Sequence, residues 1–246
     1  MMNSVFYFSC GGHSRAVADF LARELGTEAL SFGSAPPSVP RPQGEAQEVP
    51  CAGCAVVVFP VYCQSLPAPV RAFFRALRSP SAALVAVYGG VSHGRALFEA
   101  QRLYRGRVVA GAYVPTGHTF LGEGNGFDAE ALRPLVSRLR EAAAGAPAAA
   151  VRIPRSRKNP FAGFAPAWRS RVGVRLLRSD SCDGCDLCGR NCPVGAMRRG
   201  EAGRKCIRCL RCVHICPKGA LSFSLRPALR RYLARFRKQR AAEVFL

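Results

Sequence analysis

The sequence predicts an α/β fold in two parts: an open, parallel, five-stranded sheet, followed by a small, cysteine-rich α+β module. Two observations support this prediction. Over residues 1–146, short apolar runs alternate with helical patterns, as in a doubly wound sheet. Over residues 179–225, eight cysteines recur in two runs of four. No apolar run approaches the roughly 20 residues that a membrane helix needs.

Five apolar segments of the first part predict strands, and a helical pattern follows four of them. The run at 54–59 is continuously apolar, as expected of a central strand that is buried on both faces. The predicted strands are 3–8, 27–32, 54–59, 83–88 and 107–114, and the predicted helices lie in 15–25, 68–78, 95–104 and 128–143. This alternation favours an open sheet of the flavodoxin type.

Such sheets bind ligands at the carboxyl ends of their strands, at the switch point between the first and third strands. Three loops rich in small residues, 9–14, 60–67 and 89–94, converge there. The first connects a strand to a helix, an arrangement that presents backbone N–H groups to a phosphate. Tyr62 is placed to stack on a planar ligand. The candidate cofactor-binding residues are Ser9, Gly11, Gly12, His13, Ser14, Pro60, Val61, Tyr62, Gly89 and Gly90.

The second part is dominated by a cysteine repeat. Cys182, Cys185, Cys188 and Cys192, followed by Pro193, recur 24 positions later as Cys206, Cys209, Cys212, Cys216 and Pro217. Spacings of two, two and three residues are typical of bacterial [4Fe–4S] sites. In two-cluster ferredoxins the fourth cysteine of each run ligates the other cluster. That pattern gives the sets Cys182, Cys185, Cys188, Cys216 and Cys206, Cys209, Cys212, Cys192. Zinc sites more often use two separated pairs, and a reducing compartment disfavours disulfides.

The remaining cysteines and histidines carry weaker signals. Cys51 and Cys54 form a CxxC pair, which we interpret as two small hydrophobic residues at a strand end rather than a redox pair. The loop residues His13, His93 and His118 are expected at the edge of the ligand site, and His214 lies inside the second cysteine run. There is no GxGxxG fingerprint and no Ser/His/Asp arrangement, so no catalytic residue is assigned.

The positive charge is concentrated near the end of the chain. The net charge is +21, of which residues 1–150 contribute +3 and residues 151–246 contribute +18. Residues 147–178 are expected to be a basic linker, with Phe161, Phe164 and Trp168 between the domains. Residues 226–246 are expected to form a basic helix with Leu229, Leu233 and Phe236 on one face.

The chain resembles bacterial and archaeal proteins that fuse a flavodoxin-like domain to a two-cluster ferredoxin. The resemblance covers most of the chain, through VFYFSCGGHS, VVFPVYCQSLPAPVRAFF, VAVYGGVSHGRAL and the cysteine region. It implies electron transfer with FMN in the first domain. The family's phosphate loop usually reads Ser-Gly-Thr-Gly-Asn-Thr. Here Ser9 and Gly12 match, Ser14 is a conservative change, and Cys10, Gly11 and His13 depart, so Gly11 removes a hydroxyl donor.

These observations predict a cytoplasmic electron carrier, or a component of an oxidoreductase, with two [4Fe–4S] clusters and FMN. The start of the chain lacks the basic region of a signal peptide. The positive field predicts an acidic redox partner such as a ferredoxin or flavodoxin. The basic C-terminal helix is expected to cover the ferredoxin module, to dock on an acidic partner, or to make peripheral contact with an anionic membrane, in that order of preference. The alternative is a binding module with structural clusters and a nucleic-acid surface. Arg outnumbers Lys by 32 to 4. A general compositional bias towards Arg explains this ratio as well as a nucleic-acid-binding surface does.

Overall fold

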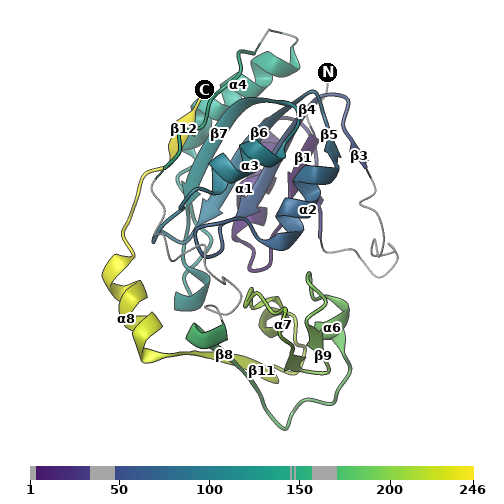
Figure 1. The fold of residues 1–246 in the computed structure, drawn as a ribbon, viewed down its shortest axis with the longest axis vertical. Coiled ribbons are helices and arrows are strands. Elements are labelled where there is room, and N and C mark those ends of the chain that lie inside the picture. Colours follow the sequence, from purple (N-terminus) through teal and green to yellow (C-terminus); the bar gives the residue numbers. More distant parts are fainter. Residues whose placement is uncertain (1–3, 34–47, 145, 147, 157–170) are drawn as a thin grey trace.

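The computed structural model describes residues 4–33, 48–144, 146, 148–156 and 171–246. The first part of the chain forms a layered α/β module, and the cysteine-rich part forms a smaller module below one edge of its sheet (Figure 1). Across these residues, no helix combines the length and apolar character that a bilayer crossing requires.

A six-stranded, mainly parallel sheet lies at the centre of the larger module. Its strand order is β12-β7-β6-β4-β1-β2, and each neighbouring pair is parallel except β12 with β7. Each of the five segments predicted as strands overlaps a parallel strand of this sheet. These strands are β1 (Ser4–Tyr7), β2 (Ala29–Ser31), β4 (Cys54–Pro60), β6 (Ser81–Tyr88) and β7 (Arg107–Pro115). The sixth, β12 (Glu243–Phe245), comes from the end of the chain.

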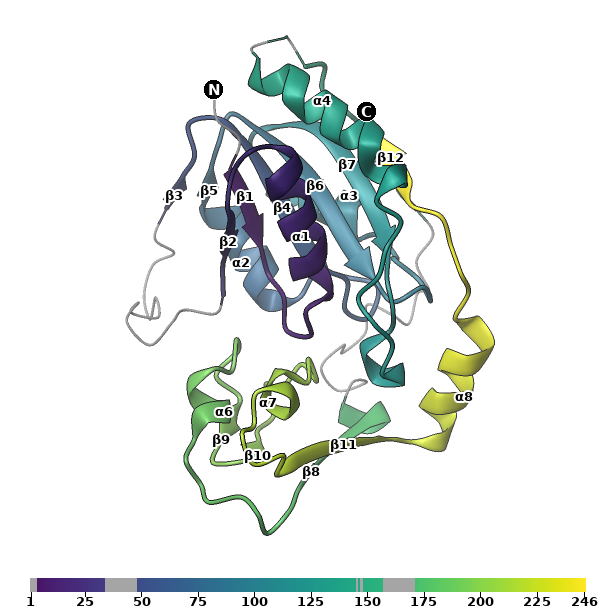
Figure 2. The ribbon, with the colours of Figure 1, turned by 180° about the vertical axis from the view of Figure 1, so that it is seen from behind.

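Helices cover both faces of the sheet, which explains why its central strands are continuously apolar. Residues Cys54 to Phe59 of β4 are all buried. Figure 2 shows α1 and α4 on one face, packed around Leu21 and Leu135, and Figure 1 shows α2 and α3 on the other, around Phe74 and Leu97. The helices are α1 (His13–Glu24), α2 (Ala68–Ala76), α3 (Ala96–Leu103) and α4 (Arg133–Ala143).

Short elements complete the larger module. A two-stranded parallel ladder joins β3 (Val49–Pro50) to β5 (Leu77–Arg78). Two turns of 3₁₀ helix, η1 (Thr119–Leu121) and η2 (Glu130–Leu132), lie in the long loop between β7 and α4. This loop leaves the sheet at the carboxyl end of β7, so η1 lies at the edge where α/β sheets bind ligands.

The smaller module combines short helices with two pairs of antiparallel strands. The antiparallel pair β8–β11 forms one sheet and the hairpin β9–β10 another. Cys188, Met197, Cys212 and Leu221 form its small buried core. The elements are β8 (Val174–Arg178), α6 (Leu187–Arg190), β9 (Met197–Arg198), β10 (Glu201–Ala202), α7 (Arg211–His214) and β11 (Leu221–Leu225).

The linker expected at 147–178 is shorter in the structure. Residues 148–156 pack on the larger module, where the Val151 amide donates to the Val108 carbonyl (2.7 Å) and Ile153 is 1% exposed. At the other end, Val174–Arg178 is strand β8. Short apolar runs between arginines predict secondary structure only weakly. The conformation of these two segments is set instead by their contacts with distant parts of the chain. The expected interdomain aromatics Phe161, Phe164 and Trp168 lie outside the described residues.

The C-terminal segment also differs from the single helix expected at 226–246. Helix α8 (Pro227–Phe236) ends at Arg237, which has an extended conformation, and the chain then returns to the larger module as β12. Val244 and Phe245 pack against the core of that module. The yellow segment in Figure 1 therefore connects the smaller module back to the sheet edge. Pairing with the exposed edge of β7 supplies hydrogen bonds that a helix pattern does not reveal.

Candidate functional site

The eight repeated cysteines line two separate cavities in the smaller module. One cavity is bordered by Cys182, Cys185, Cys188 and Cys216. The other is bordered by Cys192, Cys206, Cys209 and Cys212. Each set takes three cysteines from one run and the last cysteine from the other, as the spacing predicts. We call these the outer set (182, 185, 188, 216) and the inner set (192, 206, 209, 212).

Local backbone geometry turns the cysteines inward. Asp186 and Leu210 precede α6 and α7 with φ values of 57° and 61°, so each cysteine loop ends in a left-handed turn. Backbone amides then donate to sulfur, from Ala196 to Cys192 (3.1 Å) and from Gly200 to Cys188 (3.3 Å). Such hydrogen bonds stabilise negative charge on cluster-ligating thiolates. These hydrogen bonds suit Cys192 and Cys188 to the thiolate form, while among the described residues no group of three or more His, Cys, Asp or Glu side chains is arranged to hold a metal ion.

The two sets differ in exposure and in surrounding charge. Cys185 of the outer set is exposed, whereas Cys206 and Cys212 of the inner set are buried. Asp183 and Asp186 line the outer cavity together with Arg199 and Lys218, and the ion pair between Asp183 and Lys218 (3.0 Å) lowers the pKa of the carboxyl. Residues 203–242 contain twelve Lys or Arg and no Asp or Glu. The excess of positive charge therefore lies in the second cysteine run and in the C-terminal segment.

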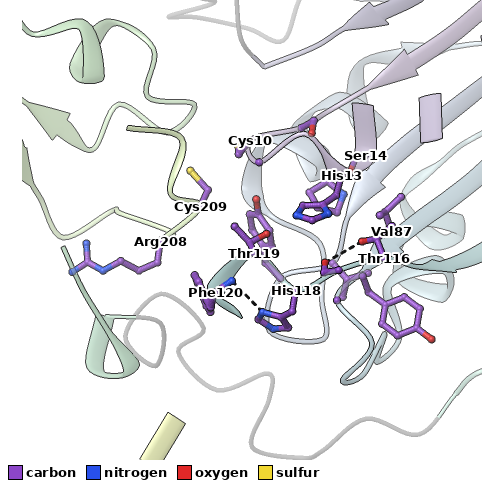
Figure 3. A pocket seen from close by; sticks show the side chains of 18 of the residues that line it. Cys10, His13, Ser14, Val87, Thr116, His118, Thr119, Phe120, Arg208 and Cys209 are labelled. Carbon is purple, nitrogen blue, oxygen red and sulfur yellow. Dashed lines mark hydrogen bonds between the residues drawn. The ribbon is translucent and has the colours of Figure 1, made fainter. Parts of the chain in front are cut away.

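A pocket lies between the two modules, at the carboxyl ends of the parallel strands (Figure 3). Eight of the ten predicted cofactor-binding residues line it: Ser9, Gly11, His13, Ser14, Pro60, Val61, Tyr62 and Gly89. Gly12 caps α1 instead, and the Gly90 carbonyl accepts from the Lys238 amide (3.2 Å). The smaller module contributes Ile207, Arg208 and Cys209. An inner-set cysteine therefore lines the same pocket as the strand-end loops.

The loop between β1 and α1 provides unpaired polar groups. Gly12 precedes α1 with φ of 89°, a conformation that favours glycine. The first amides of a helix have no partner within it, and α1 carries no acidic residue in its first turn. The Ser14 side chain is 1% exposed, and its hydroxyl has no partner among the described residues. His13 Nδ1 is also buried without one. Buried polar groups rarely stay unpaired, so these atoms indicate a ligand.

The loop after β7 closes the pocket from the other side. His118 accepts a hydrogen bond at Nδ1 from the Phe120 amide (3.2 Å), and its own amide donates to Glu123 (2.7 Å). Glu123 also accepts from Arg237 Nε (2.7 Å), so the C-terminal segment holds this loop in place. A Cβ on Gly89 would lie 2.6 Å from His118 Cδ2, so the close approach of the two loops requires glycine.

Two of the residues in the β1–α1 loop that differ from the usual phosphate-loop sequence, Cys10 and His13, lie next to the smaller module. The Cys10 side chain hydrogen-bonds with Cys209 of the inner set and with Tyr62. The Ser9 carbonyl accepts from Arg211 Nη1 at 3.5 Å. His13 faces His214 closely enough for their charges to interact. Cys10 and His13 therefore lie where the loop meets the inner set.

Burial changes the ionisation of the groups that line the pocket. Burial lowers the pKa of His13, with a further decrease from His214. Burial also lowers the pKa of His118, where Arg237 and His13 act in the same direction and Glu123 opposes them. Burial raises the pKa of Tyr62 well above its usual value. At neutral pH the two imidazoles and the phenol are consequently uncharged.

One histidine that was expected at the edge of the site lies elsewhere. His93 stacks on Tyr113 (3.7 Å between ring centroids) and pairs with Glu243 of β12 (3.3 Å), so it does not line the pocket. Cys51 and Cys54 are buried near the amino end of β4, away from the strand ends that form the pocket. Burial raises the pKa of Cys54.

Several pocket residues were not among the predicted binding residues. Thr116, Gly117, Thr119 and Phe120 follow β7, whose carboxyl end lies at the same edge as the three predicted loops. His118 of the same loop, which was expected at the edge of the site, also lines the pocket. That position was a usable signal, because every loop at this edge can reach the ligand site. The pocket is also lined by Ile207, Arg208 and Cys209 of the smaller module. The local sequence could not predict this, because it depends on how the two modules dock.

Comparisons with known proteins identify the cysteine-rich part. Residues 204–222 match the model of the 4Fe-4S binding domain. An uncharacterized protein of Methanocaldococcus jannaschii is 45% identical over 58 residues, which is 22% of this chain and 24% of that protein. The match thus spans about a quarter of that relative's length.

Two crystal structures are similar to part of this chain. They are of candidate flavoproteins from Bacteroides uniformis and Bacteroides eggerthii, 12% and 14% identical to this chain. They cover 55% and 56% of this chain and 97% of each of those chains, with TM-scores of 0.39 and 0.36. From the family match, the chain contains a 4Fe-4S binding domain, which supports an iron–sulfur electron-transfer role.

Proposed function

We propose that this chain is an electron-transfer iron–sulfur flavoprotein, with two [4Fe–4S] clusters and one FMN, that exchanges electrons with an acidic redox protein. The observation that carries the proposal is the shared pocket, which Cys209 of the inner set lines together with the strand-end loops of the larger module. This arrangement brings a cluster site and a ligand site into contact.

The outer and inner sets would each hold one cluster through four thiolates. The crossed sets tie the two halves of the smaller module together, and the two cavities are bordered by the ligands that a bacterial two-cluster ferredoxin would use. The amides of Ala196 and Gly200 would stabilise charge on Cys192 and Cys188. The parallel order β7-β6-β4-β1-β2 supports a flavodoxin-type sheet for the larger module.

The pocket residues fit a flavin phosphate. The start of α1 offers free amides and a positive dipole end, and Ser14 offers a buried hydroxyl without a partner. The loops at Val61 and Gly89 border the space for the ring system. Tyr62 lines this space, and its hydrogen bond with Cys10 places the phenol towards the inner set. A bound flavin exchanges one or two electrons and clusters exchange one, so together they would link the two kinds of transfer.

The arrangement of the sites suggests an order for electron transfer. The outer set is the more exposed, at Cys185, and the inner set is next to the pocket, at Cys209. Electrons would enter at the outer set and reach the pocket through the inner set, or leave by the reverse route. The twelve cations of residues 203–242 would attract an acidic partner by long-range electrostatics.

Rapid mixing under anaerobic conditions tests this proposal. A reduced acidic ferredoxin should bleach both the cluster and the flavin absorbance, at a rate that falls steeply as salt is added. A Cys185→Ser variant, which removes an outer-set ligand, should slow flavin bleaching. A Cys51→Ser variant, at the other end of the sheet, should not. If flavin is reduced at the same rate in the wild type, Cys185→Ser and Cys51→Ser, the proposed route through the outer set is refuted. If the rate in the wild type does not depend on salt, the acidic partner is refuted.

A further inference from the structure

The β1–α1 loop has a glycine where a hydroxyl-bearing side chain would face the anion site. Gly11 has space beside it, and the Thr119 side chain from η1 fills that space. Thr119 Cγ2 lies 3.4 Å, and Oγ1 3.5 Å, from the position that a Cβ on Gly11 would occupy. A hydroxyl from a distant segment therefore lies beside the loop that would bind the phosphate. Both residues line the pocket, and Figure 3 shows the Thr119 side chain there.

A second observation indicates an anion at this place. Ser14, in the first turn of the 12-residue helix α1, lines the same pocket, is 1% exposed and has no partner for its hydroxyl. The nearby carboxylate of Glu123 is neutralised by Arg237 at 2.7 Å, so it would not repel an anion strongly. Free amides and two hydroxyls together suit a phosphate group.

Thr119 is held in a fixed position. It begins η1, directly after His118, whose Nδ1 accepts from the Phe120 amide and whose own amide donates to Glu123. A prepositioned donor loses little conformational entropy when it binds a ligand. We propose that Thr119 donates a hydrogen bond to the FMN phosphate in place of the hydroxyl that Gly11 lacks, with Ser14 as the second hydroxyl donor. This proposal rests on the flavin site proposed above.

Comparing FMN with riboflavin isolates the phosphate contact, because the two molecules differ only in that group. The flavin is first removed from the cluster-loaded protein, and each flavin is then titrated by fluorescence quenching. Thr119→Val should weaken FMN binding by about 10- to 100-fold, the range for a hydrogen bond to a charged group. Riboflavin binding should stay within about 2-fold. Thr119→Ser keeps the hydroxyl and should restore most of the FMN affinity.

Thr27→Val is the matched control, since Thr27 lies just beyond the opposite end of α1. It should leave the affinities for both flavins unchanged. Suppose that the wild type binds both flavins. If Thr119→Val then lowers the affinities for FMN and riboflavin equally, or lowers neither affinity, the role of Thr119 is refuted while the flavin site stands. If the wild type binds neither flavin, the flavin site and the role of Thr119 are both refuted.

Discussion

The hydrogen bond between Cys10 and Cys209 predicts a measurable change in the potential of one cluster. Between the free thiols the contact lowers the pKa of Cys10 and raises that of Cys209, so Cys209 is the donor. If Cys209 is bound to iron as a thiolate it can only accept, and the Cys10 thiol then becomes the donor. A donor to a ligating sulfur stabilises the reduced cluster, which carries more negative charge, and so raises the potential. Replacing Cys10 by Ala removes that donor and should lower the potential of the inner cluster only.

The size of the shift follows from the strength of one hydrogen bond. A net contribution of about 0.5–1.5 kcal/mol is typical, and a one-electron couple changes by about 59 mV for each tenfold change in equilibrium constant. Because about 1.4 kcal/mol corresponds to a factor of ten, the expected decrease is about 20–60 mV. Cys10→Ser retains a donor and should shift the potential less.

An anaerobic redox titration followed by electron paramagnetic resonance measures this shift. In the wild type and in Cys10→Ala, one midpoint potential should move and the other should stay. Cys51→Ala is the control, because it removes the same thiol from a buried site near the amino end of β4. Two unchanged potentials in Cys10→Ala, or an equal shift in Cys51→Ala, would refute the contact with the inner cluster.

Three further predictions concern stability. Ser14→Ala should raise the unfolding free energy of flavin-free protein by about 1 kcal/mol while weakening FMN binding, because it removes a buried, unpaired hydroxyl; a lower stability in thermal unfolding would contradict this. The pKa values of His13 and His118 are lowered, so the unfolded chain binds more protons below about pH 6.5 and stability should fall as the pH drops from 7 to 5. His13 faces His214 and Glu123, and His118 faces Glu123, Arg237 and His13. Urea unfolding should show a smaller pH-dependent loss in a His118→Gln variant; an equal loss would exclude His118 as its source. Phe245→Ala should lower the unfolding free energy by about 2 kcal/mol, which is about half the cost of deleting a fully buried Phe side chain, because the Phe245 ring is half-buried against Tyr113. An unchanged urea midpoint would show that β12 does not stabilise the edge of the sheet.

The parts of the fold that the sequence predicted well have strong local periodicity. The segment 54–59 is apolar without interruption, so its place in the centre of the sheet followed from its composition. The two cysteine sets followed from spacing, because a turn of fixed length places three of the four side chains. The Ser9 to Ser14 loop followed from its position between a strand and a helix.

The parts that the sequence did not predict depend on contacts between distant segments. Strand β12 forms because β7 has an open edge, and nothing in Glu243–Phe245 distinguishes it from a helix end. Thr119 was missed because its place beside Gly11 is set by the path of a loop of more than ten residues. The contact of Cys10 with Cys209 depends on the docking of two modules. Local sequence patterns do not contain information about such contacts between distant segments.

The composition of the protein purified without oxygen tests the central claim most directly. Iron, sulfide and flavin are assayed per chain, together with the absorption spectrum. Two [4Fe–4S] clusters and one FMN predict about eight irons, about eight sulfides and about one flavin, with broad brown absorbance beneath the flavin bands. A colourless protein that contains zinc would contradict the account of the cysteine sets. About eight irons without flavin would contradict the account of the pocket.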